Sequence, residues 1–394
     1  MDQFPKVFLK PNRERSLQRF HLWVFSGAIK GISGKPEEGD IVEVCNASGN
    51  YLATGHIQNG SITVRIFSFN QTAAGRDFWK EKFERAFALR KTLGFFDNPD
   101  TNVFRLVHGE GDGFPGLILD YYNGVVVLQA HSAGMWRHRE LFAEVIREIA
   151  GDKVIAVYDK SASTLNTAEA SDTTKFLFGS AESIEVKEYG HRFEIDFREG
   201  QKTGFFIDQR ENRKLLEKYC NGKKVANIFA YTGGFSVYAA AAGATLVDSL
   251  DSSEKAMDLA RKNMEINFGE RPEHRYFKQD AFEFFKSPPE NYDVIVLDPP
   301  AFAKHQQALN NALKAYRRIN EAAIRNLTPG GVLFTFSCSQ AVSKEDFRKA
   351  VFTSAAATGR TVKILHQLNQ PADHPVNIYH PEGAYLKGLV LFVE

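Results

Sequence analysis

The sequence has few cysteines and no long apolar run, and each absence excludes a class of protein. Its 394 residues include only three cysteines, Cys45, Cys220 and Cys338, which lie far apart in the chain. It has no Cys-x-x-Cys pair and no Cys/His cluster with zinc spacing, so we expect neither a disulfide framework nor a bound metal. No apolar run of about 18 residues or more is present, so we expect no membrane-spanning segment.

The chain also has almost no net charge, since 49 Lys and Arg face 48 Asp and Glu. This balance excludes a protein that is a polycation overall, but the first 30 residues are locally basic. That patch could contact phosphates or could be a solvated face: Lys6, Lys10, Arg13, Arg15, Arg19 and Lys30. The start of the chain lacks the apolar core of a signal peptide, and we therefore expect a cytoplasmic protein.

The pattern of apolar residues predicts three domains. In residues 1–72, apolar residues alternate with polar ones between Gly, Asn and Ser turns, which is typical of a small β-barrel. Residues 73–195 begin with a helix over 78–93 and continue with strands and one helix over 136–149, which indicates an α+β domain. Residues 196–394 repeat strand and helix, which predicts an α/β domain with a mostly parallel, doubly wound, Rossmann-like sheet.

A glycine turn follows the first strand of this third domain and indicates a nucleotide-like ligand. Tyr231-Thr-Gly233-Gly234 connects the strand to a helix, and glycines allow the backbone to approach a ligand closely. Asp251 ends the next strand, where a carboxylate can accept both hydroxyls of a ribose, and Asp280 ends the third, near an adenine edge. A dinucleotide would require G-x-G-x-x-G, so the loop favours S-adenosylmethionine (SAM) over NAD.

The ends of the fourth and fifth strands carry candidate catalytic side chains. Asp298-Pro299-Pro300 presents a carboxylate on a stiff loop, where it could contact a nucleobase or simply end a strand. Cys338 follows the neighbouring strand. A thiolate that adds to carbon 6 of a pyrimidine makes carbon 5 nucleophilic, so we hypothesise that Cys338 is this nucleophile. An isolated cysteine is otherwise typical of a buried core position.

Four motifs together resemble the bacterial RlmI-type class I SAM-dependent 23S rRNA (cytosine-C5) methyltransferases. They are Thr203-Gly-Phe-Phe-Ile-Asp-Gln-Arg210, Tyr231-Thr-Gly-Gly-Phe-Ser236, Asp298-Pro-Pro-Ala-Phe302 and Ser337-Cys-Ser339. Two N-terminal motifs look like the same family: Trp23-Val-Phe-Ser-Gly-Ala-Ile29 and Glu110-Gly-Asp-Gly-Phe-Pro-Gly-Leu-Ile118. The resemblance covers essentially the whole chain.

The resemblance implies a PUA domain, a central α+β domain and a methyltransferase domain that forms 5-methylcytosine in 23S rRNA. It implies that Cys338 is the nucleophile and that Asp298 holds the polar edge of the cytosine. It also implies a set of residues around SAM: Phe206, Asp208, Gln209, Asn227, Phe229, Tyr231, Gly233, Asp251 and Asp280.

The sequence departs from the family at two places. Asn227 and Ala230 stand where the family usually has Asp and Cys, and Asn227 lacks the charge that would attract the ammonium group of SAM. Leu22 follows His21 where His-Pro is more usual, which we expect to affect only a turn.

Three other functions remain as alternatives. A methyltransferase that acts on a base nitrogen would use Asp-Pro-Pro and leave Cys338 incidental. A non-catalytic RNA-binding or ribosome-assembly factor would follow if the altered strand at Asn227 had lost activity. An NAD-dependent oxidoreductase is disfavoured by the glycine loop. We expect RNA as the partner, no membrane contact, and a homodimer as one option through exposed strand edges.

Overall fold

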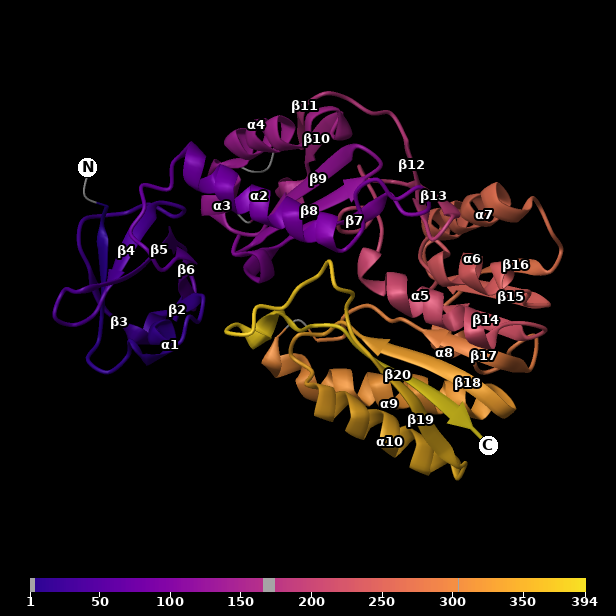
Figure 1. Ribbon diagram of the computed structural model, residues 1–394. Coiled ribbons are helices and arrows are strands. Elements are labelled where there is room, and N and C mark those ends of the chain that lie inside the picture. The colour runs from indigo at the N-terminus through magenta and orange to yellow at the C-terminus, as the bar shows by residue number, and fades with distance from the viewer. Residues whose placement is uncertain (1–3, 166–173, 304) are drawn as a thin grey trace. The chain divides into compact units, whose positions relative to one another are not determined.

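The computed structural model describes residues 4–165, 174–303 and 305–394, and it divides into two compact units (Figure 1). The first unit contains the chain up to Val186, together with Ile195–Phe205 and Ala372–Gly383. The second contains Lys187–Glu194, Phe206–Pro371 and Ala384–Glu394. The segment Ala372–Gly383 therefore belongs to the first unit although its sequence neighbours on both sides belong to the second. No described helix is both long enough and apolar enough to cross a membrane.

The first unit begins with a six-stranded sheet that follows the predicted alternation. Its order is β2-β6-β5-β4-β1-β3, and β1 pairs in parallel with β4. Val7, Leu9, Val42, Val44 and Val64 are all nearly inaccessible and form its core. The sequence did not predict the short strands β2 and β3. The elements are β1 (Lys6–Leu9), α1 (Arg15–Gln18), β2 (Trp23–Phe25), β3 (Ile29–Ile32), β4 (Ile41–Cys45), β5 (Tyr51–Ile57) and β6 (Ile62–Ser68).

A second, five-stranded sheet with order β11-β10-β9-β8-β7 follows in the same unit. Helices α2 and α4 pack against each other beside it, and Trp79, Phe83 and Phe142 are fully buried there. The elements are α2 (Arg76–Thr92), β7 (Val103–His108), β8 (Leu117–Tyr122), β9 (Val125–Ala130), α3 (Ala133–Arg137), α4 (Arg139–Ala150), β10 (Ala156–Asp159) and β11 (Lys175–Phe178).

The helix predicted over 136–149 is present as α4 but begins later, at Arg139, because a break at His138 separates it from α3. The backbone of His138 leaves the helical region, with φ −92° and ψ 1°. Its Nδ1 lies 2.8 Å from the carbonyl oxygen of Gly134. A side chain that bonds to the preceding turn in this way competes with the main-chain helix ladder.

The second unit is built on a seven-stranded sheet with order β16-β15-β14-β17-β18-β20-β19. Strands β14 to β18 run parallel to one another, whereas β20 runs antiparallel to both β18 and β19. The predicted mostly parallel sheet is thus confirmed. The strands are β14 (Lys224–Ile228), β15 (Leu246–Asp251), β16 (His274–Lys278), β17 (Tyr292–Leu297), β18 (Leu327–Ser337), β19 (Val362–Leu368) and β20 (Lys387–Val393).

Helices cover both faces of this sheet (Figure 1). Helices α9 and α10 pack on one face over a core that includes Ile295, Leu333 and Tyr316. Helices α5, α6 and α7 lie on the other face. Ser253 caps α7, since its Oγ accepts a hydrogen bond from Ala256 N at 3.3 Å. The helices are α5 (Arg210–Leu216), α6 (Gly234–Ala241), α7 (Glu254–Phe268), α8 (Ala281–Phe284), α9 (Leu309–Asn326) and α10 (Lys344–Thr358).

Short elements complete the described chain. Strands β12 (Ile184–Glu188) and β13 (His191–Ile195) pair as a two-stranded sheet. The 3-10 turns are η1 (Ser26–Ala28), η2 (Gly109–Asp112), η3 (Gly151–Lys153), η4 (Ser161–Ser163), η6 (Ile207–Gln209), η7 (Glu217–Tyr219), η8 (Gln306–Ala308) and η9 (Pro381–Gly383).

Candidate active site

The predicted site residues of the second unit gather at one edge of its sheet. Because β14 to β18 are parallel, their carboxyl ends meet at the same edge, which is where open α/β sheets bind ligands. Asp251 is the last residue of β15, Asp298 follows β17 and Cys338 follows β18. Five adjacent strands thus deliver a row of polar side chains to one edge.

The glycine turn after β14 has a backbone that few residues adopt. Phe229, Tyr231 and Gly233 all have positive φ, at 63°, 47° and 78°. Two non-glycine residues in this conformation indicate strain that the surroundings must hold, and such strain is common at ligand sites. A Cβ on Gly233 would lie 3.1 Å from the Cβ of Ala260, so the turn packs closely on α7.

Asp251 fixes this turn from the neighbouring strand. Its Oδ2 accepts a hydrogen bond from Tyr231 N at 3.0 Å, and its Oδ1 accepts one from Ser253 N at 3.0 Å. Each carboxylate oxygen has a further lone pair, and the side chain is only half-buried. Asp251 can therefore hold the loop and still accept from a hydroxyl of a ligand.

Asp280 has a structural role that the sequence did not predict. It lies two residues beyond β16 and caps α8, with Oδ1 accepting from Phe282 N at 2.8 Å and from Glu283 N at 3.2 Å. It is exposed, so the other oxygen can still reach a ligand.

The segment Phe206–Gln209 lies beside the glycine turn. The rings of Phe206 and Tyr231 meet edge to face, with centroids 5.0 Å apart. Asp208 and Gln209 are buried: Oδ2 of Asp208 accepts from the hydroxyl of Tyr385 at 2.6 Å, and Oε1 of Gln209 accepts from Asn212 at 2.6 Å. Phe206 is only half-buried and is the member of this segment most open to a ligand.

Asn227 lies inside the fold, on the face of β14 that meets α6. It is 1% exposed, and its Nδ2 donates to the Oγ of Ser236 at 2.9 Å. Its Oδ1 is buried and accepts no hydrogen bond within the described chain. A buried acceptor without a donor is unfavourable by about 1–3 kcal/mol, which marks this atom as one that a bound group could satisfy.

The loops after β17 and β18 converge. Ser339 is fully buried and ties them together, because its Oγ accepts from Ala303 N at 3.3 Å and lies 3.0 Å from the hydroxyl of Tyr316. The Sγ of Cys338 lies 4.0 Å from the carbonyl oxygen of Pro299, directly after Asp298. Cys338 is partly exposed, whereas Cys45 and Cys220 are buried.

The sequence missed Lys387, at the start of β20. Its side chain is 5% exposed, and its Nζ donates to Ser339 O at 2.5 Å and to Val342 O at 2.8 Å. Burial lowers the pKa of Lys387 to about 8, and the nearby thiol of Cys338 opposes that shift when it is ionised. An ammonium group here can stabilise a Cys338 thiolate. Its only sequence signal is a lysine at the start of an apolar strand.

Arg213 was also missed, since an arginine on a short helix is usually solvated. It is 2% exposed and forms a bidentate pair with Glu188, with both distances 2.8 Å. Its Nη1 donates to Phe206 O at 3.0 Å, and its Cδ would lie 3.1 Å from a Cβ on Gly234. Arg213 thus connects the Phe206 segment to the start of α6.

Phe302, in the loop after Asp298, is half-buried. Its ring lies 4.8 Å from that of Tyr316, against the core under α9.

Family models match most of the chain. Residues 104–391 match the S-adenosylmethionine-dependent methyltransferase family, and residues 7–69 match the PUA-like domain. The chain belongs to the SAM-dependent methyltransferases. Its cofactor is therefore SAM. Asp251, the close glycine turn and the unsatisfied Asn227 Oδ1 fit such a ligand, since SAM offers ribose hydroxyls and an ammonium group and has no phosphate.

Similar proteins extend over nearly the whole chain. The "Ribosomal RNA large subunit methyltransferase I" proteins of Shewanella amazonensis and Alteromonas mediterranea are 39% and 38% identical to it, with 98% of each chain covered. A SAM-dependent methyltransferase structure from Streptococcus mutans has a TM-score of 0.85 at 22% identity and covers 98% of this chain and 100% of its own. A methyltransferase structure complexed with SAH gives a TM-score of 0.86, also at 22% identity and with 98% and 100% covered. At this identity both structures show a shared fold.

Proposed function

We propose that this SAM-dependent methyltransferase forms 5-methylcytosine in 23S rRNA through a covalent adduct of Cys338. The observation that carries the proposal is the convergence of a partly exposed thiol with the loop that bears Asp298, at the cofactor edge of the sheet. The names of the relatives support ribosomal RNA as the substrate class.

In this mechanism the thiolate of Cys338 adds to carbon 6 of the cytosine, and electron density moves to carbon 5. Bound SAM would supply an electrophilic methyl group to carbon 5, and S-adenosylhomocysteine would be the leaving group. A base then removes the carbon 5 proton, the 5,6 double bond forms again, and the thiolate leaves. The protonated Lys387 supports Cys338 as a thiolate, and Asp298 accepts a hydrogen bond from the polar edge of the base.

The N-terminal sheet supplies features suited to RNA. Lys10, Arg13, Arg15, Arg19 and Lys30 are exposed and can neutralise phosphates. Phe20 and Phe25 are 47% and 46% exposed, and bare aromatic rings can stack on unpaired bases.

Covalent trapping tests the proposal. A 23S rRNA transcript made with 5-fluorocytidine should form a denaturation-resistant complex with the wild-type protein and SAM, because fluorine at carbon 5 cannot leave as a proton does. Cys338→Ala should form no complex and transfer no methyl group, while SAM affinity stays the same.

Cys220→Ala is the matched control, since Cys220 is fully buried and burial raises its pKa to about 12. This variant should trap the RNA normally. If Cys338→Ala still methylates rRNA, the thiol is not the nucleophile, and methylation of a base nitrogen replaces 5-methylcytosine formation as the proposed reaction.

A further inference from the structure

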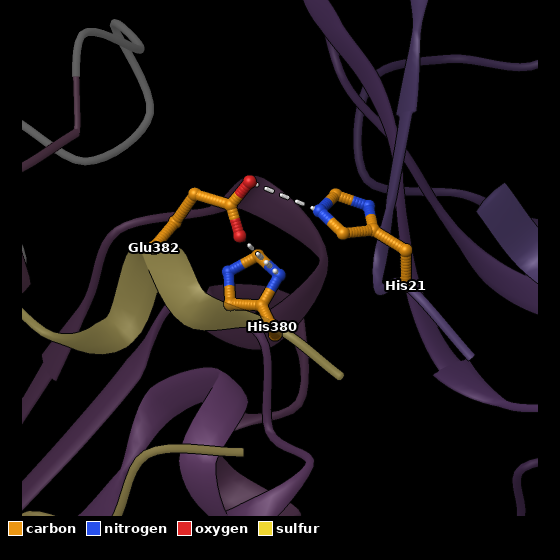
Figure 2. Close-up of side chains that lie close together, drawn as sticks. All are labelled: His21, His380 and Glu382. Carbon is orange, nitrogen blue, oxygen red and sulfur yellow. Dashed lines mark hydrogen bonds and ion pairs between the residues drawn. The ribbon is translucent and has the colours of Figure 1, made fainter. Parts of the chain in front are cut away.

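Three side chains of the first unit converge outside the methyltransferase sheet (Figure 2). His21 lies between α1 and β2, whereas His380 and Glu382 come from the segment Ala372–Gly383. The Nε2 of His21 lies 3.1 Å from Oε1 of Glu382, and the Nδ1 of His380 lies 3.5 Å from Oε2. One nitrogen or oxygen from each residue lies within 4.8 Å of the others.

These distances match the edges of a tetrahedral metal site. Zinc–nitrogen and zinc–oxygen bonds near 2.0–2.1 Å put neighbouring ligand atoms about 3.3 Å apart. The distance from His21 Nε2 to Oε1 of Glu382, 3.1 Å, is close to that value. The 3.5 Å distance from His380 Nδ1 is to the other carboxylate oxygen, so Glu382 must turn to present one oxygen to both rings. Small shifts of three side chains would therefore bring them around one ion.

One buried nitrogen of this cluster has no hydrogen-bond partner within the described chain. His380 is 1% exposed, and its buried Nδ1 makes no hydrogen bond within the described chain. A cation between Nδ1 and the Glu382 carboxylate would satisfy both groups.

The surrounding residues hold both rings in place, as the second layer of a metal site does. The carbonyl oxygen of Trp23 lies 3.3 Å from the Nδ1 of His21, and in the tautomer in which Nδ1–H donates to it, the lone pair of Nε2 is left for a ligand. The indole of Trp23 meets the His380 ring edge to face at 4.4 Å. That indole is itself fixed, because its Nε1 donates to Oε1 of Glu110 at 2.8 Å.

We propose that His21, His380 and Glu382 bind one divalent transition-metal ion, with Zn²⁺ as the best fit, and that a water completes the tetrahedron. Two imidazoles and one carboxylate favour such ions over Mg²⁺ and Ca²⁺, which prefer all-oxygen sites. The ion joins the N-terminal sheet to a segment about 360 residues away, since His21 and Glu382 are 361 positions apart. The inference is independent of the RNA substrate.

The test uses the full-length protein after dialysis against a chelator. Co²⁺ should produce the visible absorption of a tetrahedral site at one ion per chain, and Zn²⁺ should displace it. Glu382→Gln and His21→Ala should each weaken Zn²⁺ binding by roughly 100-fold or more, since loss of a direct ligand exceeds the effect of losing an outer partner. Glu382 is exposed and His21 is half-buried, so both variants should fold, which circular dichroism can verify.

His191→Ala is the matched control. His191 also pairs with a glutamate, Glu217, at 3.2 Å, but no three-ligand group forms around it within the described ranges. This variant should bind the metal as the wild type does. Stoichiometric binding that survives both cluster variants, or no tetrahedral Co²⁺ spectrum in the wild type, would overturn the proposal.

Discussion

The two halves of the candidate active site differ in how they are built. In the cofactor half, at the ends of β14, β15 and β16, each side chain is held by residues close in sequence or on the next strand; Asp280, for instance, caps the helix that follows it. In the reaction half, at the ends of β17 and β18, the loop after Cys338 is held by Lys387 from β20, whose Nζ donates to Ser339 O; Lys387 lies 49 positions after Cys338 by residue number. Local motifs thus describe the first half almost completely and the second half only in part.

Among the changes that should affect one half of the site and not the other, we expect the largest loss of ligand affinity from a substitution of Asp251. Asp251→Ala removes the acceptor for Tyr231 N and Ser253 N, and it also removes the proposed partner of the ribose hydroxyls. SAM affinity should fall roughly 10- to 100-fold, since hydrogen bonds to a charged group contribute about 1.5–3 kcal/mol. Isothermal titration measures this directly. Asp258→Ala, at an exposed position on α7, should bind SAM normally. Unchanged affinity in Asp251→Ala would remove it from the cofactor site.

A smaller effect, confined to the reaction half, is expected at Lys387. Loss of its charge in Lys387→Met should raise the pKa of the Cys338 thiol, so the acidic limb of the kcat/KM profile should move to higher pH while SAM affinity stays constant. Lys363→Met, on the exposed face of β19, should leave the profile unchanged. A profile that does not move would show that Lys387 only shapes the loop after Cys338.

The lowered pKa of Lys387 also predicts how the free energy of unfolding depends on pH. The folded pKa of about 8 lies below the ordinary value of 10.5, so between these values the unfolded chain binds more protons than the folded one. The contribution of Lys387 to stability should therefore rise with pH across that window and be absent in Lys387→Met. Urea midpoints measured from pH 7 to about pH 10 provide the comparison.

The smallest effect is expected at Asn227, whose buried Oδ1 accepts no hydrogen bond within the described chain. Asn227→Asp places a carboxylate in a buried position and should lower the stability of the SAM-free protein by about 1–3 kcal/mol. Saturating SAM should restore much of that loss, because its ammonium group can pair with the new charge. Thermal unfolding with and without SAM tests this.

Asn320→Asp is the matched control for Asn227→Asp. Asn320 is equally buried, and its Oδ1 also has no hydrogen-bond partner, but it lies on α9. SAM should not restore its stability. Equal recovery in both variants would mean that Asn227 does not face the cofactor.

Much of the fold was predictable because its signals are local. The local sequence pattern gave β1, β9, β17 and β19, and strand–helix repeats gave the parallel sheet whose ends align Asp251, Asp298 and Cys338. The PUA-like and methyltransferase folds are confirmed, whereas the domain limits at 72 and 195 and the roles of individual site residues stay predictions.

The rest of the molecule depends on distant contacts that spacing cannot reveal. Lys387 lies beside Cys338 only because β20 inserts antiparallel between β18 and β19. The zinc pattern that we looked for was absent from the sequence, yet His21, His380 and Glu382 meet in space. A pattern search within one stretch of chain cannot find ligands that the fold brings together.

The segment Ala372–Gly383 has a consequence for how the protein is made. Asp373 accepts hydrogen bonds from the buried Arg90, through its carbonyl oxygen at 2.8 Å, and from Arg105 N, through its carboxylate at 2.9 Å. During synthesis Arg90 and Arg105 emerge from the ribosome long before Asp373 is added to the chain. The N-terminal unit can therefore reach its final form only after residues 372–383 have emerged, and a fragment that stops near residue 205 would lack this segment and its contacts.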